Sequence, residues 1–240
     1  MDIQAILYAA AILHAGYLIQ LAFRQPNTRV ISTKIESWPM WIAASPIGTM
    51  IARFITLAIA AHHATVALSL SNTLPHSNEV LQTVCPTPQY MNTQLFTWSQ
   101  STVVALALLY VGIYVRLQAY AQLGTNFTYR IAKPDELVTS GFYAYVRHPS
   151  YTGLFVVLVA FYSLFIQQRG LLSCWAPLIS EKLVIDEKHA YVLPLVGFSV
   201  FISLFMMRRV AEEEEMMEKA FGDRWRQHKA RTKKFIPYVY

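Results

Sequence analysis

The segment Gly141–Gly153, with the sequence GFYAYVRHPSYTG, lies between a polar connection and a long apolar run. Arg147 and His148 end the polar part, and Pro149 follows them. A proline disfavours helical backbone at the residue before it, so His148 is expected to be extended at the mouth of a membrane helix that begins near Ser150. This geometry suits a binding site. It suits equally well an interfacial anchor, in which Arg and Tyr side chains reach the lipid headgroups.

The apolar residues of the chain occur in long blocks. Hydrophobic residues make up 55% of the 240 residues, and charged residues only 14%. Blocks of this length cross a bilayer as helices. The first of them is expected to be a retained span and not a cleaved signal segment. The sequence therefore predicts an all-α, polytopic helical membrane protein with about five transmembrane helices, at Ile3–Phe23, Ile47–Leu70, Gln100–Leu123, Ser150–Phe165 and Ala190–Met207.

Positive charge is distributed unevenly among the connections. The segment Arg24–Lys34, the connection Arg116–Arg147 and the C-terminal tail carry nearly all Lys and Arg residues, whereas Ser71–Trp98 carries none. The connection Gln167–His189 blurs this pattern, because acidic residues balance its positive ones. The positive-inside rule then places the motif and the tail on the cytosolic side. The net charge of +6 is explained by this topology and by anionic lipid, so no nucleic-acid partner is expected.

Two histidines and two cysteines could bind a metal, form hydrogen bonds or form a disulfide. His62 and His63 lie deep in the second span, and neighbouring residues of a helix point to different faces. Hydrogen bonding between helices is therefore favoured over a metal site, and no metal ligand is predicted. Cys85 and Cys174 both fall in connections that the charge rule places away from the cytosol. A disulfide in an oxidising lumen is possible there, but the sequence leaves it open whether the two are bonded.

The C-terminal tail places carboxylates on a predicted packing face. On a helix of about 100° per residue, Glu213 and Glu214 fall on the apolar arc formed by Met206, Val210, Met217, Ala220 and Phe221. Glu212, Glu215 and Lys219 fall on the opposite, solvated side. Carboxylates on a packed face need donors. Either Arg147 or Arg130 supplies them as an ion pair, or a bound ligand does.

Several motifs, in this order, resemble the isoprenylcysteine carboxyl methyltransferase family. They are LGTNF at Leu123–Phe127, LVTSGFYAYVRHPSYTG at Leu137–Gly153, the spacing from Arg209 to Glu214, Phe221-Gly222 and Ile236-Pro237. The similarity extends from about Arg116 to the C-terminal residues. It is specific for the broad family of membrane methyltransferases and less specific for a substrate.

The resemblance implies a site for S-adenosyl-L-methionine beside a site for a carboxylate. In that family the RHPSY motif and the Glu-Glu pair bind the cofactor, which implies cofactor-binding roles for Tyr145, His148, Tyr151, Glu213 and Glu214. The family arginines associated with the substrate carboxylate match Arg116 and Arg209, which are the expected catalytic residues. The resemblance also implies a cytosolic cofactor site built from the entrance of the fourth span and the C-terminal helix.

The organisation expected from this resemblance is one membrane domain over residues 1–240. Residues 1–99 form N-terminal spans, and residues 100–240 form the catalytic core. The expected location is the endoplasmic reticulum membrane if the source is eukaryotic, with the active site facing the cytosol. The sequence indicates no particular oligomeric state.

The expected reaction is carboxyl O-methylation of a lipophilic substrate, with a C-terminal prenylcysteine or another isoprenoid acid as the favoured acceptor. A carboxylate has a pKa near ~4, so it is already ionised at neutral pH and needs no general base. Positioning of the carboxylate against the methyl donor and exclusion of water would account for the rate acceleration. Two alternatives stay open: a membrane sterol-type reductase with a nicotinamide cofactor, which shares an Ile-Pro-Tyr like Ile236–Tyr238, and a phospholipid N-methyltransferase. A non-catalytic scaffold is disfavoured, because it has no use for carboxylates on an apolar arc.

Overall fold

The computed structural model describes residues 2–24, 45–128, 133–167, 169–175 and 189–238, and within these ranges the protein is helical. Five helical segments are long and apolar enough to cross a membrane. They are α1 (Ile3–Ala22), α3 (Pro46–Leu70), α5 (Gln100–Leu123), α6 (Pro149–Phe161) with the turns that continue it, and α8 (His189–Phe221). The predicted all-α fold with five spans is therefore confirmed, and the chain is an integral membrane protein.

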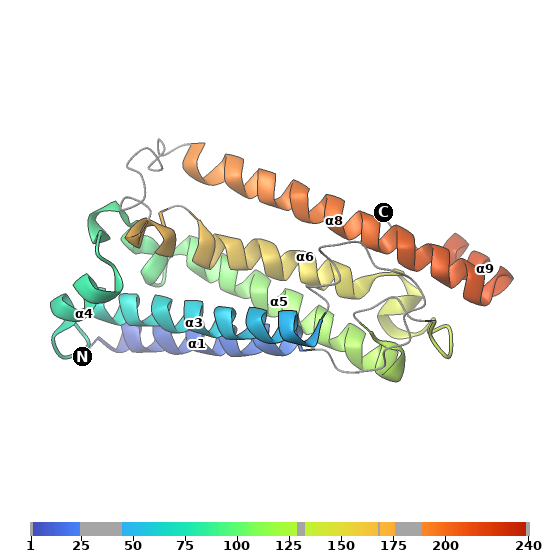
Figure 1. Ribbon diagram of the computed structural model, residues 1–240, viewed down its shortest axis with the longest axis horizontal. Helices are drawn as coiled ribbons and strands as arrows, with labels where there is room; N and C mark the ends of the chain where they lie inside the picture. Colours follow the sequence, from blue (N-terminus) through green and yellow to red (C-terminus); the bar gives the residue numbers. More distant parts are fainter. Residues whose placement is uncertain (1, 25–44, 129–132, 168, 176–188, 239–240) are drawn as a thin grey trace.

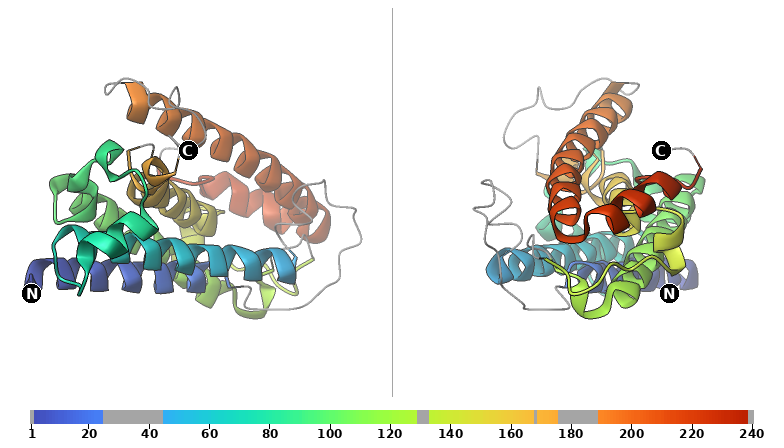
Figure 2. Two further views of the ribbon diagram at one scale, coloured as in Figure 1. Left: turned by 60° about the vertical axis from the view of Figure 1, so that its left-hand side comes forward. Right: turned by 90° about the vertical axis from the view of Figure 1, so that its right-hand side faces the viewer.

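The first four spans form one packed bundle (Figure 1). Helix α1 packs along α3, and α5 packs along α6. Apolar side chains from all four helices fill the centre, among them Tyr8, Ile12, Leu109 and Val157. Helix α8 lies against α6, and its N-terminal end is farther from the bundle than its C-terminal end (Figures 1 and 2). Only 11% of its most apolar window is buried, compared with 33% to 44% in the other spans, so most of that window is exposed on the outside of the bundle.

Helix α8 differs from the sequence prediction at its C-terminal end. The fifth span was predicted to end at Met207, and the segment Met206–Phe221 was treated as a helix of the tail. The structure instead continues one helix to Phe221, because Arg, Glu and Met are good helix formers and Arg209 pairs with Glu213 one turn later. The helix ends before Gly222, whose φ of 53° lies in the left-handed region that glycine favours. A final helix, α9 (Asp223–Arg231), then folds back beside the bundle (Figure 2).

The connection Ser71–Trp98 was predicted as a loop, but it contains a helix of its own. Helix α4 (Ser77–Val84) is followed by the short 3-10 turns η1 (Pro88–Tyr90) and η2 (Thr93–Phe96). Prolines interrupt this stretch closely enough to hide the helix in the sequence. Cys85 follows α4 directly and forms a disulfide with Cys174, at the end of η6 (Leu171–Cys174). The pairing that the sequence left open therefore exists, and it closes the end of the bundle where α4 lies.

The two histidines of α3 bind backbone carbonyl groups of this closed end. His62 Nε2 lies 2.7 Å from the Val84 carbonyl oxygen, and His63 Nε2 lies 3.1 Å from the Leu95 carbonyl oxygen. The Tyr8 hydroxyl donates to the same Leu95 oxygen at 2.7 Å. The prediction that these histidines hydrogen-bond between elements is confirmed.

Helices α5 and α6 cross closely because two glycines meet at the crossing. A Cβ atom added to Gly153 would lie 2.7 Å from the Gly112 carbonyl oxygen and 2.8 Å from the Arg116 backbone nitrogen. No side chain fits at that distance, so glycine is required for this approach. As a result Arg116 of α5 lies beside Ser150 of α6. Beyond the crossing, α6 continues into the π-helical turn η5 (Tyr162–Ile166).

Candidate functional site

A cavity of about 740 Å³ lies at the end of the bundle opposite the disulfide. Helices α3, α5, α6, α8 and α9 and residues 134–138 contribute to its wall. Ile55 of α3, Leu158 of α6 and Ile202 of α8 line the part that reaches into the membrane spans. Arg209, Glu213, Trp225 and His228 belong to the lining as well. One cavity therefore joins an apolar region between the spans to a charged and aromatic region at their ends.

The motif of Gly141–Gly153 enters this wall at the start of α6. His148 caps the helix with φ −130° and ψ 56°, which is not helical, and Pro149 is the first residue of α6. The C-terminal segment runs beside the motif. The backbone nitrogen atoms of Arg147 and His148 donate to the carbonyl oxygens of Lys233 and Lys234 at 2.8 and 3.0 Å. The backbone that aims His148 is therefore held by residues more than eighty positions away in the chain, which no local pattern could predict.

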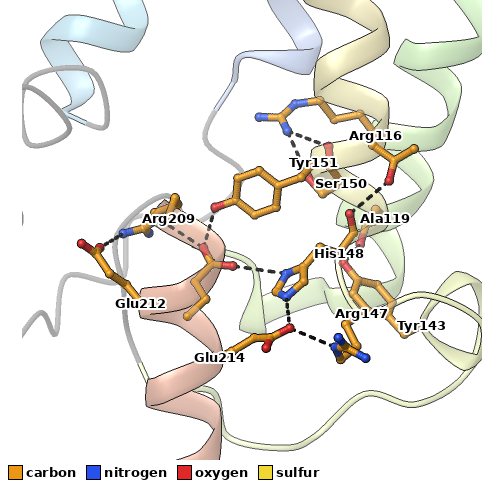
Figure 3. A network of polar contacts seen from close by, with 12 residues as sticks. Arg116, Ala119, Tyr143, Arg147, His148, Ser150, Tyr151, Arg209, Glu212 and Glu214 are labelled. Atoms are coloured by element: carbon orange, nitrogen blue, oxygen red, sulfur yellow. Dashed lines mark hydrogen bonds and ion pairs between the residues drawn. The ribbon is translucent and has the colours of Figure 1, made fainter. Parts of the chain in front are cut away.

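The two carboxylates of α8 flank the His148 ring. Nδ1 of His148 lies 3.6 Å from Glu213, and Nε2 lies 3.4 Å from Glu214 (Figure 3). Glu213 accepts a hydrogen bond from the Tyr151 hydroxyl at 2.6 Å. The Glu213 and Glu214 side chains are 22% and 10% exposed, whereas Glu215 is 52% exposed. The predicted inward direction of the Glu213-Glu214 pair is therefore confirmed.

Basic side chains neutralise Glu214. Arg147 Nε lies 2.9 Å from one carboxylate oxygen, and Lys229 Nζ lies 3.1 Å from the other. Arg147 also donates to the carbonyl oxygens of Lys229 and Thr232 at the end of α9. The ion-pair alternative considered for the inward carboxylates therefore holds for Glu214 and Arg147, whereas Arg130 lies outside the described residues. Glu214 is not part of the cavity lining, and Glu213 is.

The two predicted catalytic arginines line the cavity from different helices. Arg116 is 4% exposed, which rules out a headgroup anchor; its Nε donates to the Ala22 carbonyl oxygen at 2.9 Å. Its Nη1 donates to the Ser150 hydroxyl at 3.0 Å (Figure 3). Its guanidinium lies over the Tyr120 ring. Arg209 is also buried, with its Nε 3.2 Å from Glu213. Arg116 thus links α1, α5 and α6, and Arg209 connects the cavity to the Glu213 carboxylate.

Tyr145, a predicted cofactor-binding residue, lies outside the cavity, whereas Tyr143 lies in the cavity wall. Tyr145 is 55% exposed and is not among the cavity residues, whereas Tyr143 is buried and lines the cavity. The Tyr143 hydroxyl donates to the Ala119 carbonyl oxygen at 3.4 Å (Figure 3). Burial raises the pKa of Tyr143 above its ordinary value; the Glu213 charge raises this pKa further, and Arg116 opposes the shift. Tyr143 is therefore a neutral phenol in the site.

Sequence reasoning also missed Trp225 and His228. Both lie on α9, both are buried, and both line the cavity. Helix α9 has the strongly charged sequence DRWRQHKAR, which is typical of a solvated helix and gives no sign of a cavity wall. The spacing of three residues between Trp225 and His228, which places them on one helix face, was the only signal available.

These observations define an integral membrane protein of five spans with a cavity that carries buried arginines and an inward carboxylate. A sequence model of the isoprenylcysteine carboxyl methyltransferase (ICMT) family matches residues 103–185. That match contains the RHPSY motif at the start of α6. It confirms the family resemblance predicted from the motifs: over these residues the chain is similar to the isoprenylcysteine carboxyl methyltransferase family.

Three curated proteins named protein-S-isoprenylcysteine O-methyltransferase are similar to the chain. The protein of Schizosaccharomyces pombe is 30% identical over 156 residues, which are 63% of this chain and 55% of that protein. The protein of Xenopus laevis is 28% identical over 175 residues, 71% of this chain and 52% of that protein. The protein of Dictyostelium discoideum is 28% identical over 155 residues, 63% of this chain and 55% of that protein. The chain thus spans about half the length of the relatives it matches.

Proposed function

We propose that this protein is an S-adenosylmethionine-dependent carboxyl O-methyltransferase whose acceptor is a C-terminal prenylcysteine or another isoprenoid acid. The observation that carries the proposal is the single cavity that joins apolar side chains of three spans to Arg116, Arg209 and Glu213. A lipophilic acid needs both parts, because its hydrocarbon chain enters from the bilayer while its carboxylate needs charged donors. The relatives' names agree with this substrate class.

The residues at the charged and aromatic end of the cavity fit S-adenosylmethionine. The cavity offers the Glu213 carboxylate, the Tyr151 and His148 side chains, and the buried Trp225 indole nitrogen, which has no hydrogen-bond partner among the described residues. An acidic group suits the cationic centres of the cofactor, and a donor without a partner suits its neutral acceptor atoms. When bound, the cofactor supplies an electrophilic methyl group. We propose that Glu213, Tyr151 and His148 hold it and that Glu214, paired with Arg147, keeps His148 in place.

The arginines would hold the acceptor. A guanidinium binds a carboxylate with two parallel hydrogen bonds, which fixes the direction of its oxygen lone pairs. Arg116 and Arg209 would hold the carboxylate so that one oxygen faces the methyl group that the cofactor would supply, and the products would be a methyl ester and S-adenosylhomocysteine. The carboxylate is ionised beforehand, so we assign no general base. The apolar wall removes water from the nucleophile, and Arg116 and Arg209 replace that solvation.

Two other activities make different demands on the same cavity. A sterol-type reductase would bind a nicotinamide cofactor, and a phospholipid N-methyltransferase would present a headgroup amine. An amine is protonated at neutral pH and needs a base to release its lone pair. Buried arginines repel such a cation, whereas they attract a carboxylate. The basic lining of the cavity thus favours the acid as the acceptor.

The test is a transfer assay with purified protein in lipid nanodiscs. Methyl-labelled S-adenosylmethionine is incubated with farnesylcysteine, geranylgeranylcysteine, a free isoprenoid acid or phosphatidylethanolamine. We expect label on one of the acids, and we expect mild alkali to release it as methanol, because esters hydrolyse and N-methyl groups do not. Alkali-stable label on phosphatidylethanolamine would instead establish the N-methyltransferase. Binding of a nicotinamide cofactor without any transfer would establish the reductase.

We further propose that residues 1–240 act as one membrane domain, with N-terminal spans in 1–99 and the catalytic core in 100–240. The site would face the cytosol of an endoplasmic reticulum membrane in a eukaryotic source. The disulfide between Cys85 and Cys174 supports this orientation, because it lies at the end opposite the cavity and disulfides persist in an oxidising lumen. Cysteine-reactive and protease-accessibility mapping of sealed microsomes tests the orientation directly.

A further inference from the structure

Trp225 on α9 carries a buried hydrogen-bond donor that the described part of the protein does not use. The side chain is 3% exposed and belongs to the cavity lining. Its indole nitrogen Nε1 has no hydrogen-bond partner among the described residues. Buried N–H groups are nearly always paired, because desolvating a donor without a partner costs free energy. Since the Trp225 side chain also lines the cavity, an acceptor atom of a bound ligand could supply the missing partner.

The surroundings of Trp225 restrict the kind of ligand. His228 lies one turn further along α9, with its ring centroid 5.8 Å from that of Trp225, and it also lines the cavity. Leu137, Val138 and Met217 contribute apolar side chains to the same lining. Trp225 and His228 thus form an aromatic part of the cavity wall on α9. Such a wall suits a flat heteroaromatic group with acceptor nitrogens at its edge.

The position of α9 separates this wall from the lipid-facing part of the cavity. Helix α9 follows the last membrane span and folds back beside the motif, where Val146 pairs with Lys233 (Figure 2). Under the proposed function, the apolar chain of the acceptor lies between the spans, beside Leu158 and Ile202. We therefore assign the part of the cavity at α9 to the ligand that arrives from water. The indole N–H of Trp225 needs an acceptor atom from that ligand.

We propose that Trp225 is a cofactor-binding residue, which packs against the adenosyl group and donates from Nε1 to an acceptor atom of its purine or ribose. This inference rests on the proposed function and extends it to α9, outside the family motifs quoted above. Trp225 thus takes the nucleoside end of the cofactor, while Glu213 and His148 take the end that carries charge. The helix holds its ring rigidly, since Arg147 binds the carbonyl oxygens at the end of α9.

The experiment measures S-adenosylhomocysteine binding by calorimetry with purified Trp225→Phe in nanodiscs, without any acceptor. The substitution keeps an aromatic ring and removes the donor. We expect the dissociation constant to rise about 10-fold, as for the loss of one hydrogen bond in a desolvated site. Trp175→Phe is the matched control, because Trp175 lies at the disulfide end beside Cys174 and is not part of the cavity lining. That control is expected to bind normally.

Ligand analogues identify the acceptor atom. Each analogue replaces one purine nitrogen with C–H or removes one ribose hydroxyl. For the analogue that lacks the partner of Trp225, wild-type protein and Trp225→Phe are expected to bind equally weakly, whereas every other analogue preserves the difference between them. A difference of the same size with every analogue would overturn the hydrogen bond.

Two further outcomes also decide the matter. If Trp225→Phe binds S-adenosylhomocysteine as tightly as the wild type while the KM for the acceptor rises, Trp225 serves the acceptor and the inference is wrong. If the wild type does not bind S-adenosylhomocysteine at all, the proposed function itself is wrong. Should Trp225→Phe melt below the assay temperature, calorimetry of both proteins is repeated below that melting temperature, where the same difference of about 10-fold is expected. Equal affinity of the two proteins there would again contradict the inference.

Discussion

The two ends of the helix bundle are held together by different chemistry. At the end that carries α4, a disulfide joins Cys85 to Cys174, and uncharged hydrogen bonds gather around His63 and the Leu95 carbonyl oxygen. At the end that carries α9, the contacts are ion pairs, chiefly those of Glu214 with Arg147 and Lys229. Covalent and neutral contacts keep one arrangement, whereas charged groups can exchange partners when a charged ligand enters. We therefore expect stability to depend most on the first end and chemistry on the second.

Truncation of Arg209 should produce the largest effect, and it should affect turnover. Arg209→Ala removes a charge-assisted partner from a desolvated carboxylate, which costs about 2–4 kcal/mol, or roughly 30- to 1000-fold in turnover. S-adenosylhomocysteine affinity should stay near normal, because Glu213 keeps its hydrogen bond from Tyr151. Initial rates and calorimetry on the same preparation measure both quantities.

Arg209→Lys and Glu214→Gln serve as the companion variants. Lysine keeps the charge but lacks the planar fork, so it should restore little turnover. Glu214→Gln should weaken cofactor binding, because it removes the partner of Arg147 beside His148. The opposing account makes Arg209 only the helix partner of Glu213, which lies one turn away at 3.2 Å. That account predicts equal losses of cofactor affinity in Arg209→Ala and Glu214→Gln. Such a result would contradict the assignment of Arg209 to the acceptor carboxylate.

Removal of the disulfide should lower stability and leave the chemistry of the site unchanged. The bond links residues 89 positions apart, and opening a loop of this size costs about 2–4 kcal/mol. We expect Cys85→Ser to lower the melting temperature by roughly 5–15 °C and to leave S-adenosylhomocysteine affinity unchanged. The double variant with Cys174→Ser excludes effects of a free thiol. A loss of ligand affinity in the double variant would show that the two ends are coupled, which contradicts the comparison.

The sequence predicted the spans well, because long apolar blocks determine them without reference to the rest of the chain. It also predicted the inward face of Glu213 and Glu214, since that face depends only on helical periodicity. It did not predict the features that depend on contacts between segments far apart in the sequence. The burial of Trp225 and the pairing of Lys233 with Val146 both depend on α9 and the residues after it folding back onto the motif. The disulfide likewise depends on two connections meeting in space.

The crossing of α5 and α6 connects the two ends, so a change there should affect both. In Gly153→Ala the new methyl group would lie 2.7 Å from the Gly112 carbonyl oxygen and 2.8 Å from the Arg116 nitrogen. Both are backbone atoms, so the helices must separate, at a cost of about 1–3 kcal/mol. We expect a lower melting temperature together with reduced turnover, because Arg116 moves with α5.

Gly197→Ala is the matched control for that substitution. Gly197 also lies in a spanning helix, but a methyl group there would have no atom within 4 Å. Alanine favours the helix over glycine by up to about 1 kcal/mol. The control should therefore be neutral or slightly stabilising. Equal destabilisation by both variants would mean that helix propensity, and not the close crossing, explains the effect of Gly153→Ala.

The smallest predicted effect concerns the charged end at low pH. Burial lowers the pKa of His228, and the charges of Arg147 and His148 lower it further. The folded protein therefore resists protonation of His228, whereas the unfolded chain takes up that proton as pH falls below about 6.5. Stability is lost as the pH falls, by at most about 1.4 kcal/mol per pH unit for this one group.

We expect His228→Gln to narrow the difference between melting temperatures measured at pH 7.5 and at pH 5.5, since glutamine has no proton to gain. His76→Gln provides the comparison at the other end, because the His76 side chain is 75% exposed beside α4. If His228→Gln leaves the pH dependence as it is in the wild type, His228 is not held neutral by its surroundings. The uncharged wall formed with Trp225 would then lose its physical basis, although the ion pairs of Glu214 would be unaffected.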